Sequence, residues 1–205
     1  MGDAWVQPTP LVVLDEFLAP QEWAGLLRFA LRSGDRFTGS GILGAGGEDK
    51  SDDDYRRSQV LYELGGLHGV FANRIQSYLP HVLARLRLPP FPISRFEIQL
   101  TATNDGQFFR RHKDDDAESV RTRALTFVYY FYREPKAFQG GALQLYDAQL
   151  DQRGNVSAGG HQTVYPTQNQ VVFFPSDCLH EVLPVECPSR GFADSRFTLN
   201  GWVHR

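Results

Sequence analysis

The sequence predicts an α+β protein that is mainly β, in which a β-sandwich or barrel packs against N-terminal helices. Two helical patterns fall before residue 92, whereas seven short runs rich in aromatic and β-branched residues follow it. The chain has 205 residues, of which 41% are hydrophobic and 22% charged, as expected of a globular protein with one full core. We therefore expect a single domain over residues 1–205, with a helical support region (1–92) and a β core (93–205).

The N-terminal region begins with "LVVLDEFLAP", which predicts a short strand followed by a turn. Pro20 is a favourable first helical residue, and apolar side chains recur at helical spacing after it until Leu31. A second apolar helical face runs from Leu67 to Leu79, and Pro80 either kinks this helix or starts a new one. Between the two patterns, "GSGILGAGGEDKSDDD" is rich in Gly and Asp and predicts a mobile loop.

The β region contains strand-like runs at short spacing, separated by Gly, Asn, Asp or Pro. They are "RFEIQLTAT", "ALTFVYYFY", "ALQLYD", "HQTVYP", "QVVFF", "HEVLPV" and "RFTLNGWV". Such regular spacing is typical of antiparallel sandwiches and barrels.

Composition excludes several classes of function. The net charge is −3 and no basic block occurs, which argues against nucleic-acid binding by phosphate neutralisation. No apolar run approaches the 18 residues or so of a membrane span, and the first residues lack the pattern of a secretory signal. Cys178 and Cys187 flank a predicted strand and do not suggest a disulfide framework, so we expect a cytoplasmic protein.

The stretch "QFFRRHKDDDAESV" has two interpretations: a solvated charge run, or a pair of metal ligands. If "FFRRHKD" is a strand or strand end, His112 and Asp114 point to the same side, about 6.5 Å apart along the chain. Both side chains could then reach one ion with bonds of about 2.1 Å. Asp115 would face the other way and Asp116 would lie too far along, so these two belong to the solvated turn.

His180 is the histidine best placed to add a third ligand. It follows the buried run and turn "VVFFPSDCL" and opens the next strand, whose end can face a barrel mouth. Two histidines and one carboxylate with open positions form the facial triad of non-heme Fe(II) oxygenases. The same set with Zn would suggest a hydrolase, but the adjacent Glu181 would point to the opposite face of the strand and no other general base is evident.

At this point the sequence resembles the 2-oxoglutarate and Fe(II)-dependent oxygenases, in their prolyl-4-hydroxylase-like branch. The resemblance covers about Phe96 to Trp202, and its motifs occur in the family's order. They are "GQFFRRHKD" with the His-x-Asp pair, "RALTFVYYFY" with paired tyrosines, the Gly-Gly hairpin "FQGGALQLY", "VVFFPSDCLHEVLPV" with the distal histidine, and "RFTLNGWV" as the final strand. The resemblance implies a double-stranded β-helix, of the jelly-roll or cupin-like kind, with the N-terminal helices packed on one sheet.

The resemblance also implies roles for individual residues. His112, Asp114 and His180 would bind Fe(II), and Arg196 would bind the distal carboxylate of 2-oxoglutarate, which its planar guanidinium suits. Tyr130 and Thr198 would add hydrogen bonds to that carboxylate, although Tyr130 could equally be barrel packing. Arg190 is the rival of Arg196, because it lies ten residues after His180, a spacing common in this family. Trp202 is interpreted as core packing.

Two positions depart from the family's pattern. The family often has a tyrosine nine or ten residues before the first iron histidine, where this chain has Thr103 and Ala102. The tyrosine pair is commonly followed by Leu-Asn, where this chain has Phe131 and Tyr132. The first departure affects the hydrogen bonds to the cosubstrate, and neither removes the metal triad.

The implied activity is that of a dioxygenase with 2-oxoglutarate and O₂ as cosubstrates, ascorbate as an additional reductant, and succinate and CO₂ as co-products. The expected substrate is a protein or peptide side chain, with proline first; the alternatives are a free amino acid or another small metabolite, or a non-catalytic cupin-like binding module. Repair of nucleic acid is disfavoured, because that branch carries a second arginine where Trp202 stands. The Gly39–Asp54 loop and the arginines of "YRRSQVLY" form either a lid and rim over the site or a flexible surface loop. We expect a monomer or a weak homodimer with no membrane partner.

Overall fold

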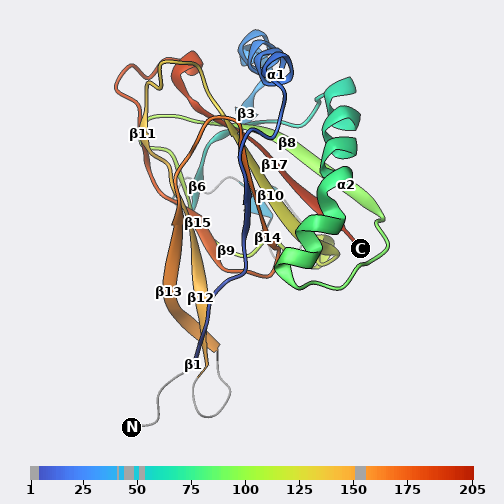
Figure 1. Ribbon diagram of the computed structural model, residues 1–205. Coiled ribbons are helices and arrows are strands. Elements are labelled where there is room, and N and C mark those ends of the chain that lie inside the picture. The colour runs from blue at the N-terminus through green and yellow to red at the C-terminus, as the bar shows by residue number, and fades with distance from the viewer. Residues whose placement is uncertain (1–4, 41, 44–48, 51–53, 151–155) are drawn as a thin grey trace.

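The strands of the computed structural model form two main antiparallel sheets, and two helices cover the outer face of one of them (Figure 1). The structure describes residues 5–40, 42–43, 49–50, 54–150 and 156–205. Most of the Gly39–Asp54 loop lies outside these residues, so its two interpretations, a lid or a surface loop, stay untested. This arrangement confirms a mainly β fold with the N-terminal helices packed on one sheet.

The larger sheet has seven strands in the order β2-β14-β10-β17-β8-β7-β3. Their bounds, in that order, are Val12–Leu14, Gln170–Pro175, Arg123–Phe131, Arg196–His204, Arg95–Thr103, Gln59–Leu61 and Thr38–Gly39. The second sheet has six strands, in the order β1-β12-β15-β9-β6, with β13 paired to β12. Their bounds are Trp5–Gln7, Leu143–Leu150, His180–Val182, Phe108–His112, Arg56–Arg57 and, for β13, Val156–Val164.

Short elements complete the described part of the chain. Two small ladders pair β11 (Gln139–Gly140) with β16 (Val185–Glu186) and β4 (Ile42–Leu43) with β5 (Asp49–Lys50). The 3₁₀ turns span Gly34–Arg36, Glu118–Val120 and Phe192–Asp194. All seven predicted strand runs coincide with observed strands, although "HEVLPV" is divided between β15 and β16. The region before residue 92 supplies strands to both sheets as well as helices.

Both predicted helices form. α1 spans Pro20–Arg32 and begins at the predicted proline; α2 spans Gly66–Leu86 as one element that continues through Pro80. An ion pair ties the two helices together, because Arg74 donates to both carboxylate oxygens of Glu22 at 2.7 and 2.8 Å. Among the described residues, no helix has both the length and the apolar character needed to cross a bilayer.

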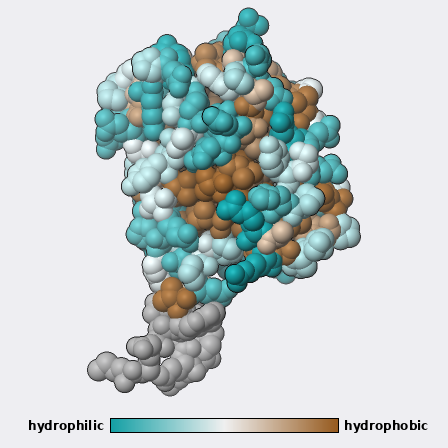
Figure 2. Space-filling model, in the orientation of Figure 1, coloured by the Kyte–Doolittle hydropathy of each residue, from teal (hydrophilic) through white to brown (hydrophobic). Residues whose placement is uncertain are grey.

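Alternation along the strands of the larger sheet separates two layers. On β10, Phe127, Tyr129 and Phe131 pack with the helices in the main core, whereas Val128 and Tyr130 face Leu143 and Leu145 of the second sheet. Thr126 alternates in step with Val128 and Tyr130 and therefore also points between the sheets. Figure 2 shows a surface that mixes polar and apolar side chains, with a broad apolar area near the middle of the face seen in Figure 1.

Candidate active site

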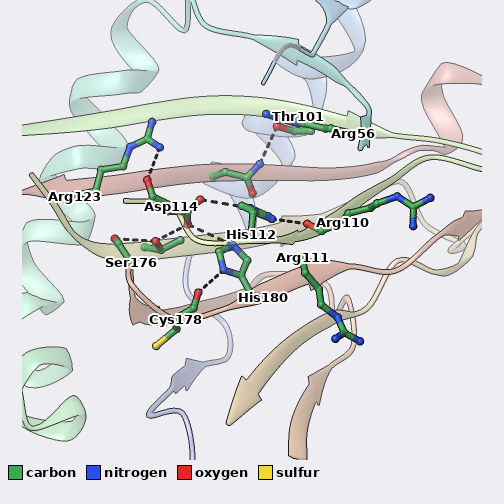
Figure 3. Close-up of polar contacts among 12 residues, drawn as sticks. Arg56, Thr101, Arg110, Arg111, His112, Asp114, Arg123, Ser176, Cys178 and His180 are labelled. Atoms are coloured by element: carbon green, nitrogen blue, oxygen red, sulfur yellow. Dashed lines mark hydrogen bonds and ion pairs between the residues drawn. The ribbon is translucent and has the colours of Figure 1, made fainter. Parts of the chain in front are cut away.

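The three predicted metal ligands meet between the two sheets. His112 is the last residue of β9 and His180 the first of β15, and the two are direct partners across these paired strands. Asp114 follows in the next turn, and its carboxylate oxygens lie 3.6 Å from His112 Nε2 and 3.5 Å from His180 Nε2. Ligand atoms of all three side chains lie within 4.8 Å of one another (Figure 3). Such a cluster is small enough to hold one ion.

A turn, and not strand alternation, brings Asp114 to the histidines. β9 ends at His112, so the predicted continuation of the strand to Asp114 is wrong. The backbone N–H of Asp114 donates to the carbonyl of Ser176 at 3.0 Å, and Arg123 Nη1 donates to the carbonyl of Asp114 at 3.0 Å. These two contacts hold the turn in the conformation that directs the carboxylate toward the imidazoles.

Backbone carbonyls orient both histidines. The Nδ1 atom of His112 lies 2.7 Å from the carbonyl oxygen of Arg110, and that of His180 lies 2.9 Å from the carbonyl oxygen of Cys178. A carbonyl only accepts, so each Nδ1 carries a proton, and Nε2 is the ring nitrogen that faces Asp114 and that a metal would take. This is the tautomer that a metal-binding histidine needs.

Charge and burial prepare the cluster for a cation. Burial alone would raise the pKa of Asp114, but the neighbouring imidazoles of His180 and His112 outweigh it and hold that pKa below its ordinary value. Burial, together with the charge of His112, lowers the pKa of His180 to about 4. At neutral pH the site therefore holds an ionised carboxylate and a neutral His180 imidazole, the protonation states of metal ligands.

A hydroxyl pair that the sequence analysis missed supports Asp114. Thr126 Oγ1 donates to Asp114 Oδ2 at 2.8 Å and lies 3.0 Å from Ser176 Oγ. Both hydroxyl groups are buried. The bond occupies one carboxylate oxygen and leaves Oδ1 for a metal. In the sequence, threonine within "ALTFVYYFY" looks like an ordinary β-former, and only its position on the same face as Tyr130 could have singled it out.

A second cluster of polar side chains, which we call the group around Arg196, lies at the first residue of β17. Arg196 is only 3% exposed, and its guanidinium carbon lies 5.0 Å from the centre of the Tyr130 ring. Tyr130 and Thr198 are direct cross-strand partners. Arg196 Nε, the Tyr130 hydroxyl and Thr198 Oγ1 are buried and form no hydrogen bond of ordinary geometry among the described residues, although the Arg196 guanidinium and the Tyr130 hydroxyl lie near enough to shift each other's pKa. Buried donors of this kind normally find a partner, so the group suits an anion such as a carboxylate.

Arg190 lies elsewhere. Its side chain is 80% exposed and pairs with Asp105 at 3.0 Å, and it does not line the cavity that contains the triad and Arg196. A glycine of the predicted Gly-Gly hairpin makes room for Arg196 instead. Gly141 has a φ of +65°, and a Cβ built there would lie 2.7 Å from Arg196 Cδ.

Comparison with known proteins identifies the family. Residues 98–204, just over half of the chain, match the family described as the 2OG-Fe(II) oxygenase superfamily. The chain belongs to this superfamily. The matched segment contains both the triad and the group around Arg196. Fe(II) and 2-oxoglutarate, which give the superfamily its name, fit a His-Asp-His cluster and a buried arginine with unpaired donors beside it.

Individual relatives agree with this membership. A PKHD-type hydroxylase of Synechocystis, itself described as uncharacterized, is 39% identical over 194 residues, which are 94% of this chain and 62% of that protein. The chain thus spans less than two thirds of that relative. A prolyl-4-hydroxylase of Pseudomonas putida has a TM-score of 0.68 at 20% identity, covering 96% of this chain and 94% of its own. A prolyl hydroxylase of Trichoplax adhaerens, solved with a peptide fragment of hypoxia inducible factor, has a TM-score of 0.65 at 20% identity, covering 96% and 84%. These structural matches confirm the double-stranded β-helix.

One cavity connects the metal-ligand cluster with the group around Arg196. Its lining includes the triad, Arg196 and Thr198, and the aliphatic side chains Val128, Leu143 and Val182. Thr103, one of the two positions where the family often has tyrosine, also lines it, whereas Ala102 belongs to the core beneath the helices. At this position the chain therefore presents the small hydroxyl of Thr103 to the cavity, where the family often has a tyrosine.

Trp202 lines the site in addition to packing in the core. It lines both this cavity and a second cavity of about 310 Å³ that also reaches His112 and Asp114. Its indole N–H is buried and is one of the groups that lower the pKa of the Asp114 carboxyl. Arg123 stacks on the ring, with its guanidinium carbon 3.6 Å from the ring centre. Trp202 thus belongs to the wall of the site as well as to the core.

We expect Thr126→Val to weaken Fe(II) binding about ten-fold, because loss of an outer hydrogen bond to a metal ligand typically costs 10–100-fold in affinity. Valine keeps the β-branched shape, so the sheet should be retained. An anaerobic Fe(II) titration measures the effect, with Thr163→Val on the distant strand β13 as the control. Equal affinities of Thr126→Val and the natural protein would show that the hydroxyl does not support Asp114.

Proposed function

We propose that this protein is an Fe(II)- and 2-oxoglutarate-dependent dioxygenase that hydroxylates an unactivated C–H bond of a protein or peptide side chain, with proline the first candidate. The observation that carries the proposal is the joint burial, in one cavity, of the His112, Asp114 and His180 cluster and of Arg196 with unpaired donors around it. Membership of the superfamily and the likeness to prolyl hydroxylases of other organisms support the reaction type.

In this proposal His112, Asp114 and His180 hold the iron, and Arg196, Tyr130 and Thr198 hold the distal carboxylate of 2-oxoglutarate. When bound, iron, 2-oxoglutarate and O₂ supply the oxidising chemistry, and succinate and CO₂ leave as co-products. The always-charged guanidinium provides the planar fork that a carboxylate matches.

The protein's own residues hold the metal-ligand side chains in position and limit the access of water. The carbonyls of Arg110 and Cys178 keep the imidazole Nε2 atoms free, and Thr126 fixes the carboxylate of Asp114. Burial raises the pKa of Tyr130 above its ordinary value, and the charge of Arg196 opposes that rise, so the phenol keeps its proton and can donate it to a carboxylate oxygen. The aliphatic wall described above limits the access of water to the reacting centre.

An anaerobic titration with Fe(II) and 2-oxoglutarate tests the proposal. We expect saturable binding of both and a visible charge-transfer band that appears only when both are present. Admission of O₂ should then release succinate and CO₂, and mass spectrometry of host proteins should find a product heavier by one oxygen. Turnover only with free amino acids or other metabolites would select the small-molecule alternative. Binding without turnover on any peptide or metabolite pool would select the cupin-like binding module.

A further inference from the structure

Two neighbouring strands of the larger sheet present a row of side chains to the candidate active site. β8 and β17 are paired in antiparallel register, so residues on their inward faces lie directly opposite one another. From the Arg196 end, the opposed pairs are Arg196 with Thr103, Thr198 with Thr101, Asn200 with Gln99, and Trp202 with Glu97. All of these except Glu97 line the cavity that contains Arg196. The row therefore extends from the group around Arg196 past the metal ligands to Trp202.

Gln99 lies in this row where the two cavities of the site meet. It lines the cavity that contains Arg196, and it also lines the second cavity, which Trp202 shares. The metal ligands His112 and Asp114 line the same two cavities. A molecule that binds the side chain of Gln99 therefore lies beside the metal ligands.

The carboxamide of Gln99 is available to a ligand, whereas the polar side chains next to it are engaged. Gln99 is only 5% exposed, and its amide forms no hydrogen bond with any residue that the structure describes. The opposed Asn200 donates from Nδ2 to Thr101 Oγ1 at 2.8 Å (Figure 3). Glu97 lies 2.6 Å from Arg123 and 3.0 Å from His204. Buried polar groups normally have a partner, so the amide of Gln99 is placed to find one in the cavity.

The cosubstrate assigned to this site is too short to occupy Gln99 as well as Arg196. Asn200, directly opposite Gln99, lies four residues after Arg196, which is about 13 Å along the strand at about 3.3 Å per residue. The five-carbon chain of 2-oxoglutarate has four C–C bonds of about 1.5 Å each and does not span that distance. The molecule that meets Gln99 is therefore the substrate.

A carboxamide matches an uncharged partner that both donates and accepts. Gln99 offers N–H donors at Nε2 and an acceptor at Oε1. A residue of an extended peptide presents its main-chain N–H and C=O toward the same neighbour, as in the hydrogen-bonded pairs of antiparallel strands. A carboxylate would use only the donors of Gln99, and an ammonium group only its acceptor. The main chain of a peptide therefore satisfies this side chain better than either charged group.

We propose that Gln99 binds the main-chain N–H and C=O of one residue of the substrate, next to the residue that is oxidised. Gln99 is then a specificity-determining residue, because it favours a residue within a peptide over a free amino acid. Proline within a chain has no N–H, so for a prolyl substrate the residue bound by Gln99 is a neighbour of the proline. This inference rests on the proposed function and assigns to Gln99 the recognition of the peptide main chain.

Peptides that contain a single ester bond test the proposal. The protein is loaded with 2-oxoglutarate and with Mn(II) in place of Fe(II), which prevents turnover. The probe is a fluorescein-labelled Ala-Ala-Pro-Ala-Ala amide. In two counterparts, lactic acid replaces the alanine directly before or directly after the proline, which removes one main-chain N–H. We expect one of the two esters to bind about ten-fold more weakly than the all-amide peptide, because it lacks one buried hydrogen bond.

The variant Gln99→Met shows whether this side chain causes the ester effect. Methionine keeps the length of the side chain and removes both hydrogen-bonding atoms. Gln99→Met should bind the all-amide peptide about ten-fold more weakly than the natural protein does, and it should no longer distinguish that peptide from the sensitive ester. Gln21→Met, at an exposed position of α1, is the matched control and should behave like the natural protein. The ester series on the natural protein needs no variant, so it tests the proposal even if Gln99→Met fails to fold.

Three results would overturn the proposal: equal affinities for the two esters and the all-amide peptide or no binding of the latter, natural affinity in a folded Gln99→Met, or displacement of the peptide by free L-proline at a lower concentration than by N-acetylprolinamide. The last result would show that the site prefers the charged ends of a free amino acid, whose carboxylate would suit Arg56 in the lining of both cavities. If Mn(II) and 2-oxoglutarate bind as expected while the peptides show none of these effects, only this inference fails. If neither binds, the proposed function fails first.

Discussion

Asp114→Ala and His112→Ala are each expected to abolish measurable Fe(II) binding while the fold survives. Each variant removes one of three groups whose ligand atoms lie within 4.8 Å of one another, and no fourth His, Cys, Asp or Glu of the described residues joins this cluster. We expect the loss to exceed the 10–100-fold that outer-shell changes cause. An anaerobic Fe(II) titration measures it, and circular dichroism with a thermal melt checks the fold.

Asp115→Ala is the matched control for this prediction. Asp115 is the adjacent carboxylate, half-buried in the same turn, and is absent from the cluster. Burial, together with the charge of Asp177, raises its pKa above the ordinary value. A carboxyl whose folded pKa is raised opposes folding once it ionises at higher pH, so its removal should not lower stability at neutral pH. Loss of metal in Asp115→Ala but not in Asp114→Ala would reverse the assignment of the ligand.

The sequence predicted the long strands well, because many consecutive residues of each one favour a strand. Long strands such as β8, β10 and β17 combine aromatic and β-branched residues over nine positions each, so their runs were visible in the sequence. Edge strands of two or three residues, such as β1 and β6, are too short to show a period, so they were missed. Their pairing depends on the sheet edge that another part of the chain provides.

For the site, too, local motifs predicted the residues, but the tertiary contacts that position them could not be predicted. Residue type and motif order predicted which side chains meet, but the reason for Asp114 was wrong: the turn is held by Arg123, nine residues along the chain, and by the distant Ser176. The support from Thr126 needs β10 of the larger sheet to lie against the turn that follows β9 of the second sheet. No local pattern encodes such a contact, because it exists only when the two sheets are packed.

Arg196→Ala is expected to weaken 2-oxoglutarate binding about 100-fold while Fe(II) still binds. Removing one member of a buried, hydrogen-bonded charge pair costs about 2–5 kcal/mol, which corresponds to a loss of tens- to thousands-fold in affinity. Arg196→Lys should restore only part of the affinity, because an ammonium offers a point charge and no planar fork. Titration of the Mn(II)-loaded protein with 2-oxoglutarate, followed by calorimetry, measures these values.

Arg190→Ala decides between the two arginines. Its exposed side chain pairs with Asp105 outside the cavity, so we expect its removal to change 2-oxoglutarate affinity less than about three-fold. A larger loss in Arg190→Ala than in Arg196→Ala would transfer the role to Arg190.

Thermal stability separates a binding role of Arg196 from a structural one. Burial lowers the pKa of Arg196, which means that the charged form is held unfavourably in the protein without its ligand. Arg196→Met, which keeps length without charge, should therefore leave the melting temperature of the ligand-free protein unchanged or raise it. The same variant should lose the rise in melting temperature that 2-oxoglutarate gives the natural protein, because that rise depends on binding. A ligand-free variant that melts several degrees lower would instead show that Arg196 stabilises the fold, and that its unpaired donors are not reserved for a carboxylate.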